Sequence, residues 1–207
     1  LSVNFTLGTT AVICYFMKKQ LVDNRTLDVH CDLTQLIDTI DLTGRSVGFL
    51  CSVHVSGGRN VALKAWTYQD TTDVQLVRGI SLRFSSDKAV DSNTDGNFYN
   101  SLSCSRTASH RAPGFPLPTW IVKLSREFAV NRYAIHNRRD VQANLLTGFR
   151  LYSFDSQNNS QFVFNNTDTV TKQVYTINHM PLPIKAVVVM ATNRNGILAL
   201  CEVEIYG

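Results

Sequence analysis

The chain ends in LALCEVEIYG, residues 198–207, and a similar stretch, GFLCSVHVSG, occupies residues 48–57. Aligned on their cysteines, both follow the pattern Leu-Cys-x-Val-x-(Val/Ile)-x-Gly. Each alternates apolar and polar residues and stops at a glycine, which predicts a half-buried strand at the end of a module. Two explanations stay open. Either two unrelated strands look alike, or residues 1–57 are the C-terminal remnant of a preceding, degenerate β-module and residues 58–207 are a complete second copy.

Short β-rich segments separated by turn residues follow one another along the whole chain. We expect strands within residues 10–16, 46–55, 79–84, 120–124, 131–136, 148–154, 185–190 and 199–206. Helical periodicity is weak, and only residues 34–40 could form a short helix. This pattern predicts an all-β fold, an antiparallel β-sandwich or jelly roll. The Gly57-Gly58 pair is the best candidate for a module boundary.

The composition excludes several classes of protein. With 44% hydrophobic and 17% charged residues among 207, the chain can bury a core, and the net charge of +4 comes without a basic stripe for nucleic acid. The sequence has no apolar run of 18 residues, so we expect no membrane insertion. We find no nucleophile, phosphate-loop or zinc-protease motif and predict that the protein is not an enzyme. Trp66 and Trp120 are expected to pack in the core or at a module edge.

Cysteines and glycosylation acceptors favour an extracellular protein, either secreted or a cell-surface ectodomain. Asn-x-Ser/Thr occurs at four asparagines, which are Asn4, Asn24, Asn158 and Asn165. None of the five cysteines lies in a CxxC motif, so structural disulfides with one thiol left over are expected. The chain begins at Leu1 without an initiator Met, which suggests a fragment or a processed piece of a glycoprotein.

From residue 58 onward, a series of landmarks occurs in a specific order. They are NVALK at 60–64, KAVDSNTDGN at 88–97, SCSRT at 103–107, PTWIVKL at 118–124, NRRD at 137–140 and LCEVEIYG at 200–207. Together they resemble the F-type lectin module, also called the fucolectin–tachylectin–pentraxin domain. The resemblance covers residues 58–207. It implies a calcium-containing jelly roll that is galactose-binding-domain-like and related to discoidin and coagulation-factor C domains.

The resemblance implies a Ca²⁺ ion held between an early loop and the last strand. Carried over by position, the ligands are Ser92, Asp95, Asn97, Ser103, Cys201 and Glu202. Asp95 and Glu202 would give carboxylates, and main-chain carbonyls with the Ser103 hydroxyl would complete the oxygen set that this hard cation prefers. The alternative is an ordinary turn rich in Asp and Asn with a solvent-facing glutamate.

The resemblance also implies two disulfides. Cys104 would pair with Cys201, next to proposed ligands of the ion, and could contribute roughly 4 kcal/mol by closing a long loop. Cys14 and Cys31 would pair in the preceding module, which leaves Cys51 without a partner. In that earlier copy, Ser52 stands where the acidic calcium ligand is expected.

The expected sugar site departs from the family pattern. Fucose-binding members resemble one another in a His shortly after the first cysteine, then Arg-x-Asp, then a basic residue five positions after the Asp. Here Arg138 and Asp140 keep the Arg-x-Asp element, Arg106 stands at the His position with His110 four residues on, and Leu145 replaces the second basic residue. Arg forks and an imidazole could donate to sugar hydroxyls. Arg138 and Asp140 could equally form a structural ion pair.

Two functions therefore compete. The first is a calcium-containing carbohydrate-binding, fucose-type lectin-like module of a secreted or cell-surface protein, with a degenerate sugar site and a glycan as its partner. The second is an adhesion or protein-recognition module that binds a cell-surface protein and keeps the calcium for structure alone.

Overall fold

The structure is a computed structural model that describes residues 1–14, 17–31, 33, 37–53, 55, 59–77, 79–109, 117–192 and 196–207. The chain divides into two compact units, Leu1–Val55 and Ser56–Gly207. The predicted Gly57-Gly58 boundary lies outside the described residues. That the first unit is a remnant of a degenerate module, and the second a complete copy, stays a prediction.

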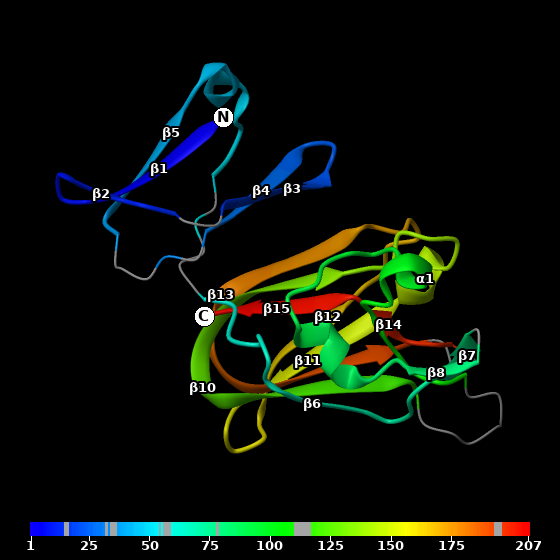
Figure 1. Ribbon diagram of the computed structural model, residues 1–207. Helices are drawn as coiled ribbons and strands as arrows, with labels where there is room; N and C mark the ends of the chain where they lie inside the picture. The colour runs from blue at the N-terminus through cyan, green and yellow to red at the C-terminus, as the bar shows by residue number, and fades with distance from the viewer. Residues whose placement is uncertain are drawn as a thin grey trace. The chain divides into compact units, whose positions relative to one another are not determined.

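The first unit consists of short antiparallel strands (Figure 1). A three-stranded sheet has the order β2-β1-β5, formed by Thr10–Val12, Ser2–Leu7 and Thr39–Thr43, and β3 (Met17–Asp23) pairs with β4 (Thr26–Cys31). Among the described residues of this unit, only Phe5 and Val12 are buried apolar side chains. The Cys14–Cys31 disulfide fixes the end of β4.

Two local predictions for this unit are wrong. Residues 46–55 are not a strand, because Arg45–Phe49 forms the 3₁₀ helix η1 and the described residues after it have no regular structure. Leu50 and Val53 are 41% and 55% exposed, so the alternating pattern buries nothing. The expected helix at 34–40 is not found in residues 37–40, of which the last two begin strand β5. Residues 34–36 lie outside the described part of the chain. Alternation alone cannot supply the neighbouring strand that a sheet requires.

The second unit is built on a six-stranded antiparallel sheet, which confirms the predicted all-β class. Its strands are β6 (Trp66–Gln69), β10 (Thr119–His136), β11 (Phe149–Phe154), β12 (Ser160–Asn165), β13 (Val174–Ala191) and β15 (Glu202–Tyr206). The order is β12-β11-β13-β10-β15, with β6 also paired to β10. β10 and β13, each 18 residues long, stay paired through two register shifts, which let strands bend. Figure 1 shows β10 curving from the part that carries β6 to the part beside β15.

The core lies between the two halves of these bent strands. In the first half of β10, Trp120, Val122 and Leu124 are buried, while the residues between them face outward. The second half supplies Tyr133 and Ile135 to the same cluster. Strand alternation therefore encloses one core between two layers, and the ends of the strands are left to carry loops.

Shorter elements complete the unit. They are β7 (Val74–Val77), β8 (Ile80–Arg83), η2 (Ser86–Val90), α1 (Phe98–Ser101), β9 (Ser105–Arg106), η3 (Ala143–Leu146) and β14 (Ala199–Leu200). β9 pairs with β14, which brings the segment before Arg106 beside the segment before Cys201. In the described part of the chain, no helix has the length and apolar character needed to cross a membrane.

The beginning and end of the second unit are joined by one side chain. Asn60 Oδ1 accepts hydrogen bonds from the main-chain N–H groups of Ala62, at 3.1 Å, and Ile205, at 3.0 Å. The N–H of Val61 donates to the carbonyl of Ile205 at 2.8 Å. These bonds hold the last strand against the first described residues of the unit.

We expect Asn60→Ala to lower the free energy of unfolding by about 1–3 kcal/mol, because two partly buried N–H groups lose their acceptor. Asn60→Asp keeps an acceptor oxygen and is the matched control. Urea unfolding followed by circular dichroism measures both, and equal losses for the two variants would contradict this role of the amide oxygen.

Candidate functional site

A loop between η2 and α1 carries three of the six predicted calcium ligands, Ser92, Asp95 and Asn97. Its alternate side chains accept hydrogen bonds from main-chain N–H groups two residues later. Asp91 Oδ1 accepts from Asn93 at 2.8 Å, Asn93 Oδ1 from Asp95 at 3.1 Å, and Asp95 Oδ1 from Asn97 at 2.9 Å. These are successive Asx turns. Each of these hydrogen bonds within the loop takes up one side-chain oxygen.

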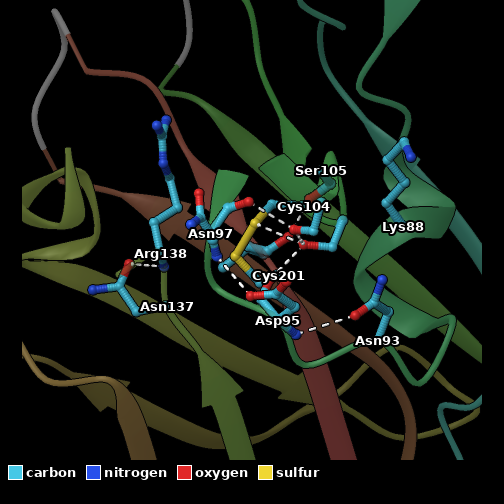
Figure 2. Close-up of a disulfide and its surroundings, with 12 residues drawn as sticks. Lys88, Asn93, Asp95, Asn97, Cys104, Ser105, Asn137, Arg138 and Cys201 are labelled. Atoms are coloured by element: carbon cyan, nitrogen blue, oxygen red, sulfur yellow. Dashed lines mark hydrogen bonds between the residues drawn. A yellow bond between two sulfur atoms is a disulfide. The ribbon is translucent and has the colours of Figure 1, made fainter. Parts of the chain in front are cut away.

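The remaining predicted ligands are linked to this loop. Ser103 Oγ donates to the carbonyl of Asp95 and lies 2.8 Å from Ser101 Oγ. Cys104, the next residue, forms a disulfide with Cys201, the residue immediately before the last strand, β15. Figure 2 shows this disulfide beside Asp95 and Asn97. The bridge therefore joins the loop region to the closing strand.

Glu202 is a buried carboxylate with an unsatisfied oxygen. Its side chain is 0% exposed, Oε2 accepts from the N–H of Ser92 at 3.1 Å, and Oε1 has no hydrogen-bond partner. Burial, together with the negative charges of Glu204 and Asp91, raises the pKa of Glu202 to about 8. Buried polar atoms normally have partners, and a buried charge needs a counter-charge. A bound cation would provide both.

Carboxylates alone do not make up a metal site in this region. Across the described residues, no three His, Cys, Asp or Glu side chains form a group that could hold a metal ion. Ca²⁺ accepts main-chain, amide and hydroxyl oxygens as well. The six predicted ligands, Ser92, Asp95, Asn97, Ser103, Cys201 and Glu202, are connected by the contacts described above, and the unpartnered oxygen of Glu202 is the feature that fits an ion. The calcium site stays a prediction.

Both disulfides have the pairing that the resemblance implies. The structure joins Cys14 to Cys31 and Cys104 to Cys201, and Cys51 is a free, exposed cysteine. The 97-residue separation of Cys104 and Cys201 makes their bridge the longer closure of the two.

The predicted sugar contact Arg138 lies in an internal ion pair. Its side chain is 0% exposed, with Nε 3.1 Å from Asp140 Oδ1 and Nη2 2.8 Å from Asp140 Oδ2. Nη1 donates to Gln142 Oε1 at 2.9 Å. The side chain of Asp140 is 13% exposed. Arg138 and Asp140 thus have the geometry of a structural ion pair, one of the two alternatives that the sequence left open.

Arg106 and Arg138 meet at one aromatic ring. The guanidinium carbon of Arg138 lies 4.0 Å from the ring centre of Phe98, and that of Arg106 lies 5.6 Å from it. Arg106 pairs with Asp73 through Nη1, while its Nε is buried without a partner. The structure thus brings two of the four sugar candidates, Arg106 and Arg138, to the same ring in α1. His110 lies outside the described residues, and Leu145 is half-buried in η3.

Sequence reasoning missed the aromatic part of this site. Phe98 is buried under the two arginines, and Tyr99 is 55% exposed with its ring edge-on to that of Phe98. Arg138 also lies 5.5 Å from the ring centre of Tyr99. The signal available was the position of both aromatics directly after Asn97, a predicted ligand. Val141, which is 91% exposed, adds an apolar side chain next to Asp140.

No family model matches this sequence, and no curated protein matches it either. Solved structures do match. A fucose-binding module of Streptococcus pneumoniae has a TM-score of 0.62 and 25% identity, and the match covers 72% of this chain and 98% of that one. The lectin domain of lectinolysin, solved with Lewis b antigen, has a TM-score of 0.61 and 22% identity over 73% of this chain and 97% of that one.

A fucolectin from the serum of striped bass, Morone saxatilis, has a TM-score of 0.59 and 24% identity over 73% of this chain and 49% of that one. These comparisons confirm the resemblance that the sequence landmarks predicted, since the structural neighbours are fucose-binding modules and F-type lectins. The fold class, an antiparallel β-sandwich, is confirmed with it.

The raised pKa of Glu202 predicts an unusual pH dependence for the metal-free protein. The folded state keeps a proton that the unfolded state loses, so the free energy of unfolding falls as the pH rises from 4.5 to about 8. The loss is on the order of a few kcal/mol. Urea unfolding in excess chelator should show this slope in the natural chain and a much flatter profile in Glu202→Gln. Parallel profiles would contradict the raised pKa.

Proposed function

We propose that the second unit is a calcium-containing carbohydrate-binding module of the fucose-type lectin kind with an altered sugar site. The observation that carries the proposal is the convergence of Arg106 and Arg138 on Phe98, directly after the predicted calcium loop. Guanidinium groups and exposed aromatic rings are the groups with which a protein holds sugar hydroxyls and apolar sugar faces. The solved neighbours include fucose-binding modules.

In this proposal the calcium ion has a structural role. Ser92, Asp95, Asn97, Ser103, Cys201 and Glu202 would hold it, and its charge would neutralise the buried Glu202 carboxylate. The ion would stiffen the loop that leads into α1, because Asn97 is also the residue that caps this helix with a 3.4 Å bond to the N–H of Asn100. Phe98 and Tyr99 would then be held in place beside the arginines.

The sugar would not be held by three exposed basic side chains, as the family pattern implies. Arg138 is fully buried, so Tyr99 offers the accessible part of this cluster. We propose that the Tyr99 ring packs against the apolar face of the sugar and that the Arg106 guanidinium donates hydrogen bonds to its hydroxyls. Arg138 and Asp140 keep the roles of sugar-site residues in this proposal: Arg138 packs over the ring of Phe98, and Asp140 holds Arg138 in that position.

A second candidate function rests on a specific observation. The Arg138 charge is satisfied by Asp140, and that of Arg106 by Asp73, so neither is required to meet a ligand. Tyr99 and Val141, which are adjacent in sequence to Phe98 and Asp140, are nevertheless exposed. An adhesion module that recognises a protein on a cell surface, with a purely structural calcium, has these properties.

An extracellular location, secreted or at the cell surface, is part of the proposal. Two disulfides support it, because such bonds persist in oxidising compartments. The asparagines of all four glycosylation acceptors, Asn4, Asn24, Asn158 and Asn165, are exposed and so accessible to modification. We propose no catalytic activity, and the arrangement described needs no nucleic-acid partner.

Calcium is expected to stabilise the protein through Glu202. At a free calcium concentration one hundred times its dissociation constant, the gain is about 2.7 kcal/mol, which appears as a rise in Tm over the chelated protein. Glu202→Gln should lose most of this rise. Glu127→Gln, which changes a carboxylate outside the loop, is the matched control. An unchanged Tm in the natural chain at millimolar calcium would contradict the site.

A glycan array with and without chelator separates the two candidate functions. The lectin proposal expects binding that needs calcium and falls at least about tenfold in Tyr99→Ala, a change of about 1.4 kcal/mol. Arg138→Ala should abolish binding, with circular dichroism reporting whether that variant folds. An empty array beside normal calcium-dependent stability would instead support the protein-recognition module.

A further inference from the structure

A second group of exposed aromatic side chains lies on β6, at the edge of the large sheet. Trp66 is 57% exposed and Tyr68 is 49% exposed, so of the two places expected for Trp66, the core or a module edge, the core is excluded. Their ring centres are 6.4 Å apart, and the ring planes are parallel to within 6°. Residues two apart in a strand share a face, so both rings stand on the outward face. Trp120, in contrast, is 1% exposed and donates its indole N–H to the carbonyl of Ser86 at 3.0 Å.

The inward side chains of β6 hold this strand in place. Thr67 Oγ1 donates to Ser86 Oγ at 3.0 Å. Gln69 Nε2 lies 3.0 Å from the carbonyl of Phe84 and 3.0 Å from that of Arg106. The strand that carries the two rings is therefore held both by its pairing with β10 and by the hydrogen bonds of its inward side chains. A rigid aromatic surface loses little entropy when a ligand binds.

A hollow of about 480 Å³ lies beside Trp66. We call it the Trp66 hollow; it is lined by Val61, Leu63, Lys64, Ala65, Trp66, Lys123, Leu124, Ser125 and Lys185. Three of these residues are lysines, and none of the described residues that line it is acidic. The Nζ atom of Lys123, which is paired with Trp66 across β6 and β10, lies 5.1 Å from the centre of the indole ring.

The Trp66 hollow is distinct from the candidate lectin site. It lies where β6 meets the first half of β10, at Lys123. The lectin candidates Arg138 and Asp140 follow the other end of β10, after His136, which pairs with Glu202, and Arg106 lies in β9. A ligand in the hollow therefore needs neither the calcium loop nor the arginine pair.

The chemistry of the hollow selects a sugar that carries negative charge. An indole face packs against the C–H face of a pyranose ring, while ammonium groups make charge-assisted hydrogen bonds with a carboxylate or a sulfate. Lys123 also contacts the Trp66 ring and Lys185 donates to the carbonyl of Ser125 at 2.8 Å, but the three positive charges face no acidic residue in the described lining, which favours an anionic ligand. We infer that the Trp66 hollow binds an anionic glycan chain, with Trp66 stacking on one sugar ring and Lys64, Lys123 and Lys185 meeting its acid groups. This inference does not rest on the proposed lectin site.

Calorimetry on the full chain tests the inference with three probes. An oligogalacturonate offers carboxylates, a heparin oligosaccharide offers sulfates, and a xylo-oligosaccharide is the neutral comparison. We expect one anionic probe to bind at least about tenfold more tightly than the neutral one. Which anionic probe binds better identifies the acid group.

Variants then assign the binding to the hollow. Trp66→Ala should weaken it at least about tenfold and Lys123→Ala several-fold, as expected for central contact residues. Leu76→Ala, at a site 76% exposed, and Lys172→Ala, at a lysine that is 47% exposed, remove matched groups elsewhere and should leave binding unchanged. Binding should also survive Tyr99→Ala and chelator, since the lectin site is not involved.

Tryptophan fluorescence gives a second, independent measurement. The chain has two tryptophans, and of these Trp66 is exposed while Trp120 is buried. An anionic probe should shift the emission of the natural chain but not that of Trp66→Phe. No binding to either anionic probe, equal binding of the neutral probe, or full binding by Trp66→Ala would each overturn the inference. So would self-association that Trp66→Ala abolishes, because the hollow would then be an interface between copies.

Discussion

The antiparallel pairing of β10 with β13 is the interaction on which the second unit depends. These strands stay paired through two register shifts, so one bent ribbon contributes to both layers and encloses the core. Each end of β10 then carries a different surface. Its first half supports β6 and the exposed Trp66, whereas its last residues lead to Arg138 and lie beside Glu202. The location of both candidate sites follows from the length and curvature of one strand pair.

Glu202 places the strongest chemical demand on the fold. A carboxylate that is 0% exposed and has one unpartnered oxygen is costly in the metal-free protein, and the raised pKa expresses that cost. Hydrophobic packing of β15 nevertheless keeps the residue there, since its neighbours Val203 and Ile205 belong to the core. A cation would convert this unfavourable position into a link between the closing strand and the loop before α1.

The sequence predicted those features that depend on neighbouring residues or on a recognisable residue type. The closing strand, the Asp- and Asn-rich loop and the cysteine pairs could be predicted, because alternation, turn chemistry and family order all applied to them. The strand expected at residues 46–55 was wrong, because alternation does not show whether a partner strand exists. The stacking of Arg106 and Arg138 on Phe98, and the exposure of Trp66, depend on tertiary packing between distant segments, which no local pattern contains.

The bonds of Asn60 to the last strand have a consequence for how this unit can be used. Residues at its beginning lie hydrogen-bonded to residues at its end, so a polypeptide enters and leaves the sandwich at one edge. Such a body can be inserted into a host loop, or repeated along a chain, without disturbing its strands. The same adjacency makes the unit suited to circular permutation, in which a short linker would join the old ends and new ends would open at an exposed turn.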